Sequence, residues 1–217
     1  MQALKKTKQE VVAEFRSAEI LEAARRVFAR KGFEGASVDE IAEAAGLAKG
    51  TVYVYFHSKR ELYLAALKQG LAALMTETGR NMDAAPTAAE KIRAFMSTRI
   101  RYAEAHRDFF ALYQAEFGNI HPACLGRVFK NLYQQQLQAV ETALDQGLAD
   151  HEIRSVPRDA AAFMVCEMTR AWIGRRLLGW SRATADEDVD FLFDLIWKGL
   201  AAGSGRARPG DVSWIVH

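Results

Sequence analysis

The sequence predicts an all-α protein whose first three helices form a helix-turn-helix head in front of a larger helical bundle. Alanine outnumbers valine plus isoleucine by 37 to 22, which favours helices over strands. Only four prolines occur. Apolar residues recur at helical spacing along most of the 217 residues, and no segment alternates apolar and polar residues as a strand would.

The composition excludes several classes of protein. Half of the residues are hydrophobic and 26% are charged, as in a folded globular chain. Cys124 and Cys166 form no CxxC pair, so a reducing compartment is expected. No segment resembles a signal peptide or reaches the ~20 apolar residues of a membrane span. We therefore expect a cytoplasmic protein with no membrane partner.

Three helices are expected in the N-terminal part, of which the second and third are short. The first ends at Gly32, because two cations and then a glycine close its last turn. The residues at 37–40 form an S-x-x-E capping box that opens a second helix, and this helix stops at Gly46. After a tight turn, a third helix covers about 49–56. Its inner face is marked by Val52 and Phe56.

Longer helices are expected in the rest of the chain. A second S-x-x-E capping box at 58–61 starts a long helix that runs toward Gly79. Prolines 86, 122 and 157 lie between the helical segments that follow, where a missing N–H is tolerated. Those helices are expected at about 87–106, 107–117, 122–150, 157–180 and 186–202.

The second and third helices, joined by a glycine turn, form a helix-turn-helix that places the later helix in the major groove of DNA. Residues 1–60 hold 11 Lys/Arg and 8 Asp/Glu, a net charge of +3, whereas the remainder holds 18 and 19. Basic side chains, backbone amides and hydroxyl groups can bind the phosphates of DNA. Thr51 and Val54 are candidates for contacts with bases. The candidate DNA-binding residues are Ser37, Lys49, Gly50, Thr51, Tyr53, Val54, Tyr55 and Lys59.

A structural alternative is a small helical unit in which the Tyr-Val-Tyr-Phe run is merely core. Tyr53, Val54 and Tyr55 span too wide an arc of a helix to be buried together in so small a unit. DNA binding is therefore the favoured interpretation of this segment.

The N-terminal segment resembles a known family. The resemblance spans about 17–65 without a gap and is carried by ILEAARRVF at 20–28, GF at 32–33, ASV at 36–38, IA at 41–42, AGL at 45–47, KGTVYVYF at 49–56, SK at 58–59 and Leu62. These segments are similar to the DNA-binding domain of the tetracycline-repressor (TetR) family. Two residues depart from the pattern. Ala48 stands where the family often has Ser or Thr, and Val54 stands where a polar or aromatic residue is common.

The resemblance implies a homodimer that binds a palindromic operator, usually as a repressor released by a small-molecule ligand. It implies a DNA-binding domain at 1–65, linked through the helix to about 80, a ligand-binding and dimerisation domain at 66–203, and a flexible tail at 204–217. Two alternatives are an activator of the same fold and a regulator that responds to no ligand. A third is an enzyme or scaffold that retains a vestigial head.

Aromatic residues and methionines at helical spacing favour a ligand site between the helices of the second domain, for an apolar or aromatic effector. The same pattern also fits an ordinary core, and Glu167 with Arg170 fits an internal ion pair. The candidate ligand-binding residues are Phe95, Arg99, Tyr102, His106, Phe110, Tyr113, Phe117, Phe129, Tyr133, Met168 and Trp172.

The last helix carries an apolar stripe of Leu192, Leu195, Ile196 and Leu200, which suits a dimer contact with the helix at 157–180. Packing within one subunit would produce a similar stripe. We expect no enzymatic activity, because the sequence has no HExxH, nucleophile elbow or P-loop. No cofactor is expected, and no metal site, since the His121 and Cys124 pair lacks further ligands.

Overall fold

The computed structural model describes residues 7–117 and 127–201, and side chains at 7–113 and 130–201. Over these ranges the protein is all-helical, with nine helices and no β-strand, as predicted. No helix in the described ranges is long and apolar enough to cross a membrane. The helices are α1 (Lys8–Gly35), α2 (Val38–Ala44), α3 (Lys49–Tyr55), α4 (Lys59–Asp83), α5 (Ala88–Ala105), α6 (Arg107–Phe117), α7 (Arg127–Ala149), α8 (Arg158–Leu177) and α9 (Ala185–Leu200).

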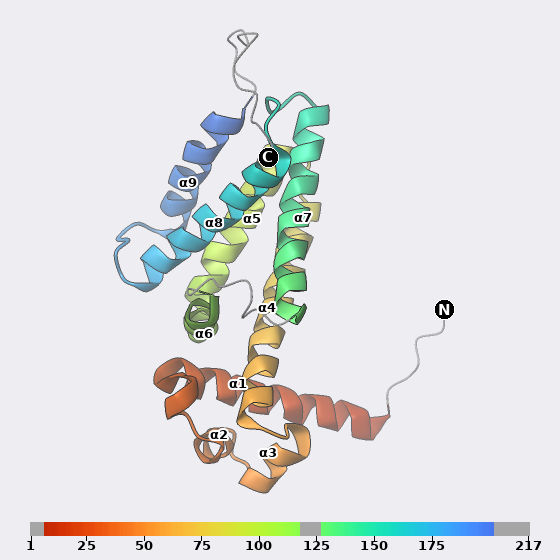
Figure 1. The fold of residues 1–217 in the computed structure, drawn as a ribbon, viewed down its shortest axis with the longest axis vertical. Coiled ribbons are helices and arrows are strands. Elements are labelled where there is room, and N and C mark those ends of the chain that lie inside the picture. Colours follow the sequence, from red (N-terminus) through yellow and green to blue (C-terminus); the bar gives the residue numbers. More distant parts are fainter. Residues whose placement is uncertain (1–6, 118–126, 202–217) are drawn as a thin grey trace, which may run out of the picture.

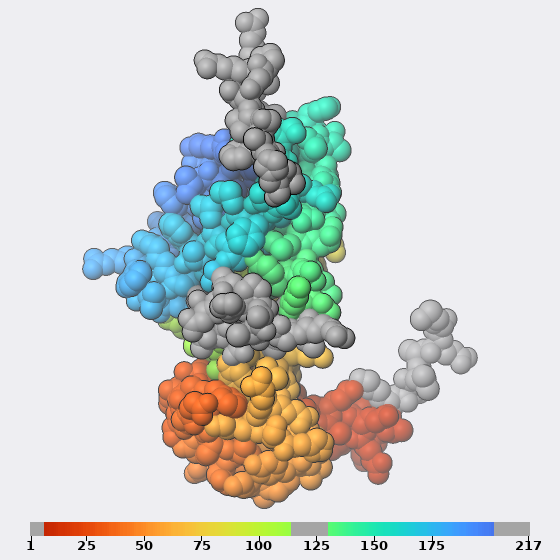
Figure 2. Space-filling view, viewed as in Figure 1, coloured from red at the N-terminus to blue at the C-terminus, as the bar shows by residue number. Residues whose placement is uncertain are grey.

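Helices α1, α2 and α3 and the start of α4 form a head at one end of the molecule (Figure 1). It appears as a rounded lobe in Figure 2. The backbone of α1 leaves the helical conformation at Gly32, with φ of 71°, where the sequence predicts its end. One further turn follows before the chain enters α2. At its other end α1 begins at Lys8, where Thr7 and Glu10 form a capping box that the sequence analysis missed.

Helix α4 connects the head with the rest of the chain (Figure 1). Near its start, the Tyr63 ring packs edge-on against Phe28, with the ring centroids 5.1 Å apart. Farther along, α4 packs against α5 and α6. Helix α6 also contacts α1, so the head meets the body through two helices (Figure 1).

Helix α5 forms the centre of the body and contacts α4, α6, α7, α8 and α9. Its inner face buries Ile92, Phe95, Met96 and Ile100 at 1% exposure or less, and this burial is the main stabilising contribution of the helix. The body therefore has one continuous apolar core, which also extends into the head.

Two expected helix ends differ from the observed ones. The expected start at 122 lies outside the described residues, which resume at Arg127 in α7. Helix α8 ends at Leu177 rather than 180, because the chain turns at Gly179 with φ of 73°. Helix α9 ends at Leu200. The predicted tail at 204–217 also lies outside the described residues.

Candidate nucleic-acid interface

The helix-turn-helix is built from α2 and α3. Helix α2 buries Val38, Ile41 and Ala42 and is followed by a turn at Gly46, whose φ of 67° favours glycine. Within the turn, the Leu47 N–H donates to the Ala42 carbonyl at 2.9 Å. This closed turn fixes the direction in which α3 leaves α2.

Helix α3 has one buried face and one exposed face. Val52 is fully buried and Phe56, which follows the helix, is nearly so, as the sequence predicts. On the other side Tyr53 is 41% exposed and Val54 is 73% exposed. An apolar residue so exposed on a short helix contributes little to this chain's core, and it is available for contact with another molecule.

The other residues predicted on this face differ in how accessible they are. Lys49 and Gly50 are exposed, whereas Thr51 is half-buried. Tyr55 is half-buried against the core of the head, so less of its ring is accessible than that of Tyr53. Ser37 is the N-cap of α2, and its Oγ accepts a hydrogen bond from the Glu40 N–H at 3.2 Å.

The Lys49 ammonium is paired within the head. Its Nζ lies 2.7 Å from Oδ2 of Asp39, a contact that raises the pKa of Lys49. Both side chains are at least half exposed, so salt screens the pair and a DNA phosphate can replace Asp39. Asp39 was not singled out in the sequence, because its proximity to Lys49 depends on the turn between the two helices.

Lys59 has an internal role that the sequence did not indicate. Its Nζ donates to the carbonyls of Glu34 at 3.3 Å and Ala36 at 3.1 Å, and it lies 4.6 Å above the centre of the Phe33 ring. These carbonyls lie at the end of α1, where backbone acceptors lack helical partners. The predicted phosphate contact of Lys59 therefore competes with a contact inside the head.

Replacing Lys59 by methionine should lower the free energy of unfolding by about 1–2 kcal/mol, since two backbone carbonyls lose a charged donor. Urea unfolding measures this loss. The matched control is Lys68→Met, because Lys68 is exposed on α4. If Lys59 also contacts a phosphate, the salt dependence of DNA binding flattens by about one unit in Lys59→Met alone. Equal stability of the two variants would contradict the internal role.

The residues predicted to bind a ligand fall in several places. Phe95, Arg99, Tyr113 and Tyr133 approach one another where α5, α6, α7 and α8 meet. The Tyr133 hydroxyl donates to Oε1 of Glu167 at 2.9 Å. The predicted internal pair of Glu167 with Arg170 is confirmed, with Nε of Arg170 lying 2.8 Å from Oε2.

Other candidates lie elsewhere in the body. The Tyr102 hydroxyl points to the Gly70 carbonyl in α4 at 3.5 Å, and the His106 side chain is exposed beside the Tyr102 ring. Trp172 stacks on Phe191 of α9 with a centroid separation of 5.3 Å. Phe110 is buried and Met168 half-buried. The side chains of Phe117 and Phe129 lie outside the described residues.

Cys166 of α8 belongs to the cluster around Arg99, although it is not among the predicted ligand-binding residues. Burial raises the pKa of its thiol to about 12, against the opposing effect of the Arg99 charge. Burial also raises the pKa of Tyr113 and of Tyr133, and Glu167 raises that of Tyr133 further. These groups are therefore neutral at physiological pH.

Two hollows occur on the described surface. One, of about 210 Å³, is lined in part by Glu104, Arg107 and Arg176, and another, of about 420 Å³, lies between Arg107, Ala111 and the end of α8. Neither is lined by a predicted ligand-binding residue. The assignment of those residues stays a prediction.

The head matches a known family over most of its length. The sequence model for bacterial regulatory proteins of the tetR family matches residues 20–66. The HTH-type transcriptional repressor AcnR of Corynebacterium efficiens is 47% identical over 60 residues, or 28% of this chain and 31% of that protein. The chain thus spans less than a third of the length of this curated relative.

More distant similarities extend over the body. The HTH-type transcriptional activator FasR of Mycolicibacterium smegmatis is 26% identical over 188 residues, covering 86% of this chain and 83% of that protein. The crystal structure of FadR from Bacillus subtilis in complex with stearoyl-CoA has the same fold, with a TM-score of 0.75 at 19% identity, covering 84% of this chain and 98% of that one. These similarities show that residues 20–66 match the DNA-binding segment of the tetR family of bacterial regulatory proteins, and that the chain shares its overall fold with FadR.

Proposed function

We propose that the chain is a sequence-specific DNA-binding transcriptional regulator that represses transcription from a palindromic operator until a small molecule releases it. The observation that carries this proposal is the exposed Tyr53 and Val54 face of α3, opposite a buried Val52, within the segment that matches the family. A helix held in this way can enter the major groove without losing its packing in the head.

The residues have separate proposed roles. Lys49, Tyr53 and Tyr55 contact phosphates, which fix the orientation of α3 on DNA. Gly50 lets the backbone approach a phosphate, and Ser37 and Lys59 contribute further contacts. Thr51 and Val54 face base edges, with the Val54 methyl groups suited to a thymine methyl. In this arrangement 1–65 form the DNA-binding domain and 66–203 the ligand-binding and dimerisation domain, with α4 in both.

We propose that a second copy of the chain covers the apolar face formed by α8 and α9. Of the predicted stripe, Leu192, Ile196 and Leu200 are buried within this chain, so they hold α9 to its own subunit. The residues left 51–58% exposed are Phe163, Met164, Phe191 and Leu195. A self-complementary contact through such a face generates the two-fold symmetry that a palindromic operator requires.

A ligand in the body reaches the head through α4 and α6 in this proposal. Both helices contact α1, so a change in their packing tilts the head. A ligand that favours the tilted arrangement weakens DNA binding only by the difference between its affinities for the two states. The stearoyl-CoA complex of FadR supports an effector with a long apolar part for this chain.

The relatives include a repressor and an activator, so the direction of regulation needs its own test. Selection of the purified protein against a random duplex pool near physiological salt should retain a two-fold symmetric motif. The position of that motif in the promoters it controls then separates a repressor, which overlaps the polymerase site, from an activator. A pool with no enriched motif would overturn the proposal of sequence-specific binding.

Replacing Tyr53 by alanine should weaken binding to the selected duplex by about 1–3 kcal/mol while dimerisation is unchanged, since the side chain is exposed on α3. Fluorescence anisotropy measures the affinity, and sedimentation velocity the assembly state. Tyr53→Phe is the matched variant, because it removes only the hydroxyl. A Tyr53→Ala protein that binds normally would remove Tyr53 from the interface.

A further inference from the structure

Arg99 of α5 is a buried cation without a counter-charge among the described residues. Arg99 is 2% exposed. Its Nε and Nη1 have no hydrogen-bond partner among the described residues. The guanidinium lies over the Phe95 ring, 5.1 Å from its centre. A ring face offers a cation far less stabilisation than an anion does in the same place.

The neighbouring carboxylates are already engaged. Oε2 of Glu167 accepts from Arg170, and Oε1 accepts from the Tyr133 hydroxyl at 2.9 Å. Glu141, on the adjacent α7, pairs with Arg158 at 3.7 Å. Among the described residues, no carboxylate lies within ion-pair distance of Arg99. Among the described residues, the cluster therefore carries one uncompensated positive charge.

A buried arginine cannot escape this cost by losing its proton, because its intrinsic pKa lies above the physiological range. Leaving a buried charge without a partner is strongly unfavourable, whereas supplying an anion recovers charge-assisted hydrogen bonds. Besides the paired Glu167 and Arg170, the described neighbours of Arg99 are apolar or neutral, including the buried Phe95, Tyr113 and Cys166. An anion that reaches this place must therefore bring an apolar remainder with it.

We propose that the effector of this protein is an amphipathic carboxylate whose anionic group pairs with Arg99 while its apolar part packs between α5, α6, α7 and α8. This inference rests on the proposed ligand-responsive function and adds the chemical class of the ligand. A carboxylate suits the site because its two planar oxygens match a guanidinium, and a single negative charge balances the excess charge of the cluster.

The test measures thermal stability of the full-length protein without DNA, with two acids, their two alcohols and dodecyl phosphate as probes. Dodecanoate and 4-phenylbutanoate represent straight-chain and aromatic carboxylates, and 1-dodecanol and 4-phenylbutan-1-ol are their neutral counterparts. At saturation, at least one acid should raise Tm by about 5 °C or more, while its alcohol does so much less. The acid that raises Tm shows whether the apolar part of the effector is a straight chain or an aromatic group.

Three variants separate recognition from folding. Arg99→Met should raise the Tm of the ligand-free protein, because it removes a buried unpaired charge, and should lower the affinity for the acid by about 10-fold or more. Arg99→Lys, which keeps the charge, should retain part of that affinity. Arg101→Met is the control, since Arg101 is exposed on the same helix and pairs with Asp186, and it should bind the acid as the wild type does.

Equal Tm shifts from each acid and its alcohol would overturn the inference, as would acid binding that survives Arg99→Met. A response to dodecyl phosphate but to neither acid would also overturn it. These failures leave the proposed function standing if the duplex selection recovers a symmetric motif. A failed selection combined with Arg99-dependent acid binding would instead reject the DNA-binding proposal and keep the ligand class.

Discussion

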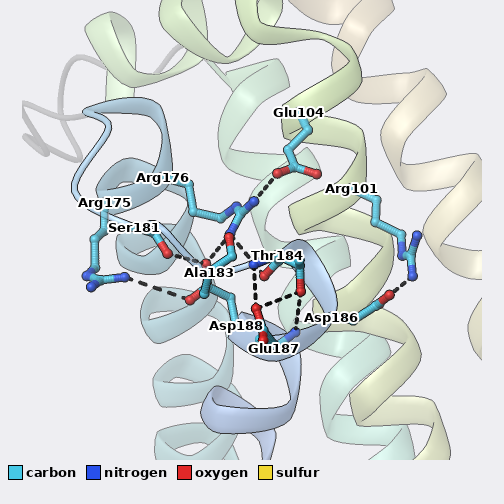
Figure 3. A network of polar contacts seen from close by, with 10 residues as sticks. All are labelled: Arg101, Glu104, Arg175, Arg176, Ser181, Ala183, Thr184, Asp186, Glu187 and Asp188. Atoms are coloured by element: carbon cyan, nitrogen blue, oxygen red, sulfur yellow. Dashed lines mark hydrogen bonds and ion pairs between the residues drawn. The ribbon is translucent and has the colours of Figure 1, made fainter.

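Replacing Asp188 by alanine should lower the free energy of unfolding by about 2–3 kcal/mol, because it removes a buried carboxylate that accepts charge-assisted and hydroxyl hydrogen bonds. Asp188 is 3% exposed at the start of α9. It pairs with Arg176 of α8 and accepts a hydrogen bond from the Ser181 hydroxyl at 2.7 Å. Arg176 also pairs with Glu104 of α5 (Figure 3). The substitution thus disrupts the polar network that joins three helices.

The matched control for this prediction is Asp186→Ala. Asp186 lies two residues earlier in the chain and pairs with Arg101, but both side chains of that pair are more than half exposed. Its removal should cost less than about 1 kcal/mol, since water and salt screen the pair. Urea unfolding of the two variants measures the difference. Equal losses would show that burial of the Asp188 pair contributes nothing.

The Asp188 carboxyl also determines in which direction the stability of the protein changes with pH. Burial raises the pKa of Asp188, but hydrogen bonds from Ser181 and Arg176 outweigh burial and hold it below its ordinary 3.8. A carboxyl with a lowered pKa stabilises the fold fully above its unfolded-state pKa. That contribution is lost as the pH falls through the lower, folded-state value. The stability of the wild type should therefore fall more steeply below pH 3.8 than that of Asp188→Asn.

Local signals in the sequence were enough to predict the helices of the head, apart from the start of α1. The capping box at Ser37 and Glu40 is formed as expected, with both reciprocal hydrogen bonds. The second expected box is only half formed. Ser58 accepts from the Glu61 N–H, but the Glu61 carboxylate accepts from the His57 N–H at 2.7 Å instead of that of Ser58. The side chain reached one residue beyond the expected backbone donor.

Three further capping boxes were missed, at Thr7, Thr87 and Thr184, although each has glutamate three residues later. The same rule applied to threonine as well as serine would have found the start of α1, and it accounts for the starts of α5 and α9, which were expected within one residue. In contrast, no local rule could have found the contact of Arg176 with Glu104, because 72 residues separate them. Such pairs exist only once the helices have packed.

In the candidate interface, too, local patterns predicted some features, whereas others depend on how the helices pack. The helical spacing of apolar residues alone predicted which residues of α3 face inward, because a short helix packed on one side must bury a fixed face. It did not predict the partners of Lys49 and Lys59, since those lie across a turn or at the end of another helix. Arg99 was selected as a polar residue among apolar ones, but its lack of a counter-charge follows only from the packing of four helices.

Replacing Gly70 by alanine should destabilise the protein by about 1–3 kcal/mol, although alanine favours helices over glycine. Gly70 lies in α4, where an added Cβ would come within 2.3 Å of Cδ2 of Phe109 in α6. Phe109 is itself buried, and its ring packs against those of Phe110 and Tyr113. The ring cannot yield without moving its neighbours, so the two helices must separate.

Gly79→Ala on the same helix is the control, because an added Cβ there meets nothing within 4 Å. It should stabilise the protein by about 0.5–1 kcal/mol through helix propensity alone. Urea unfolding gives both values. Phe109→Leu combined with Gly70→Ala should recover part of the loss, since the smaller side chain relieves the clash. Opposite signs at Gly70 and Gly79 are the expected result, and equal stabilisation would exclude a close approach of α4 and α6.

Gly70 also tests how the body reaches the head. Helices α4 and α6 both contact α1, so forcing them apart alters the support of the DNA-binding face without changing any residue on it. Gly70→Ala should therefore weaken binding to the selected duplex, while Gly79→Ala leaves it unchanged. If the Gly70 variant loses stability but binds DNA with wild-type affinity, the α4–α6 crossing holds the body together and does not transmit ligand binding to the head.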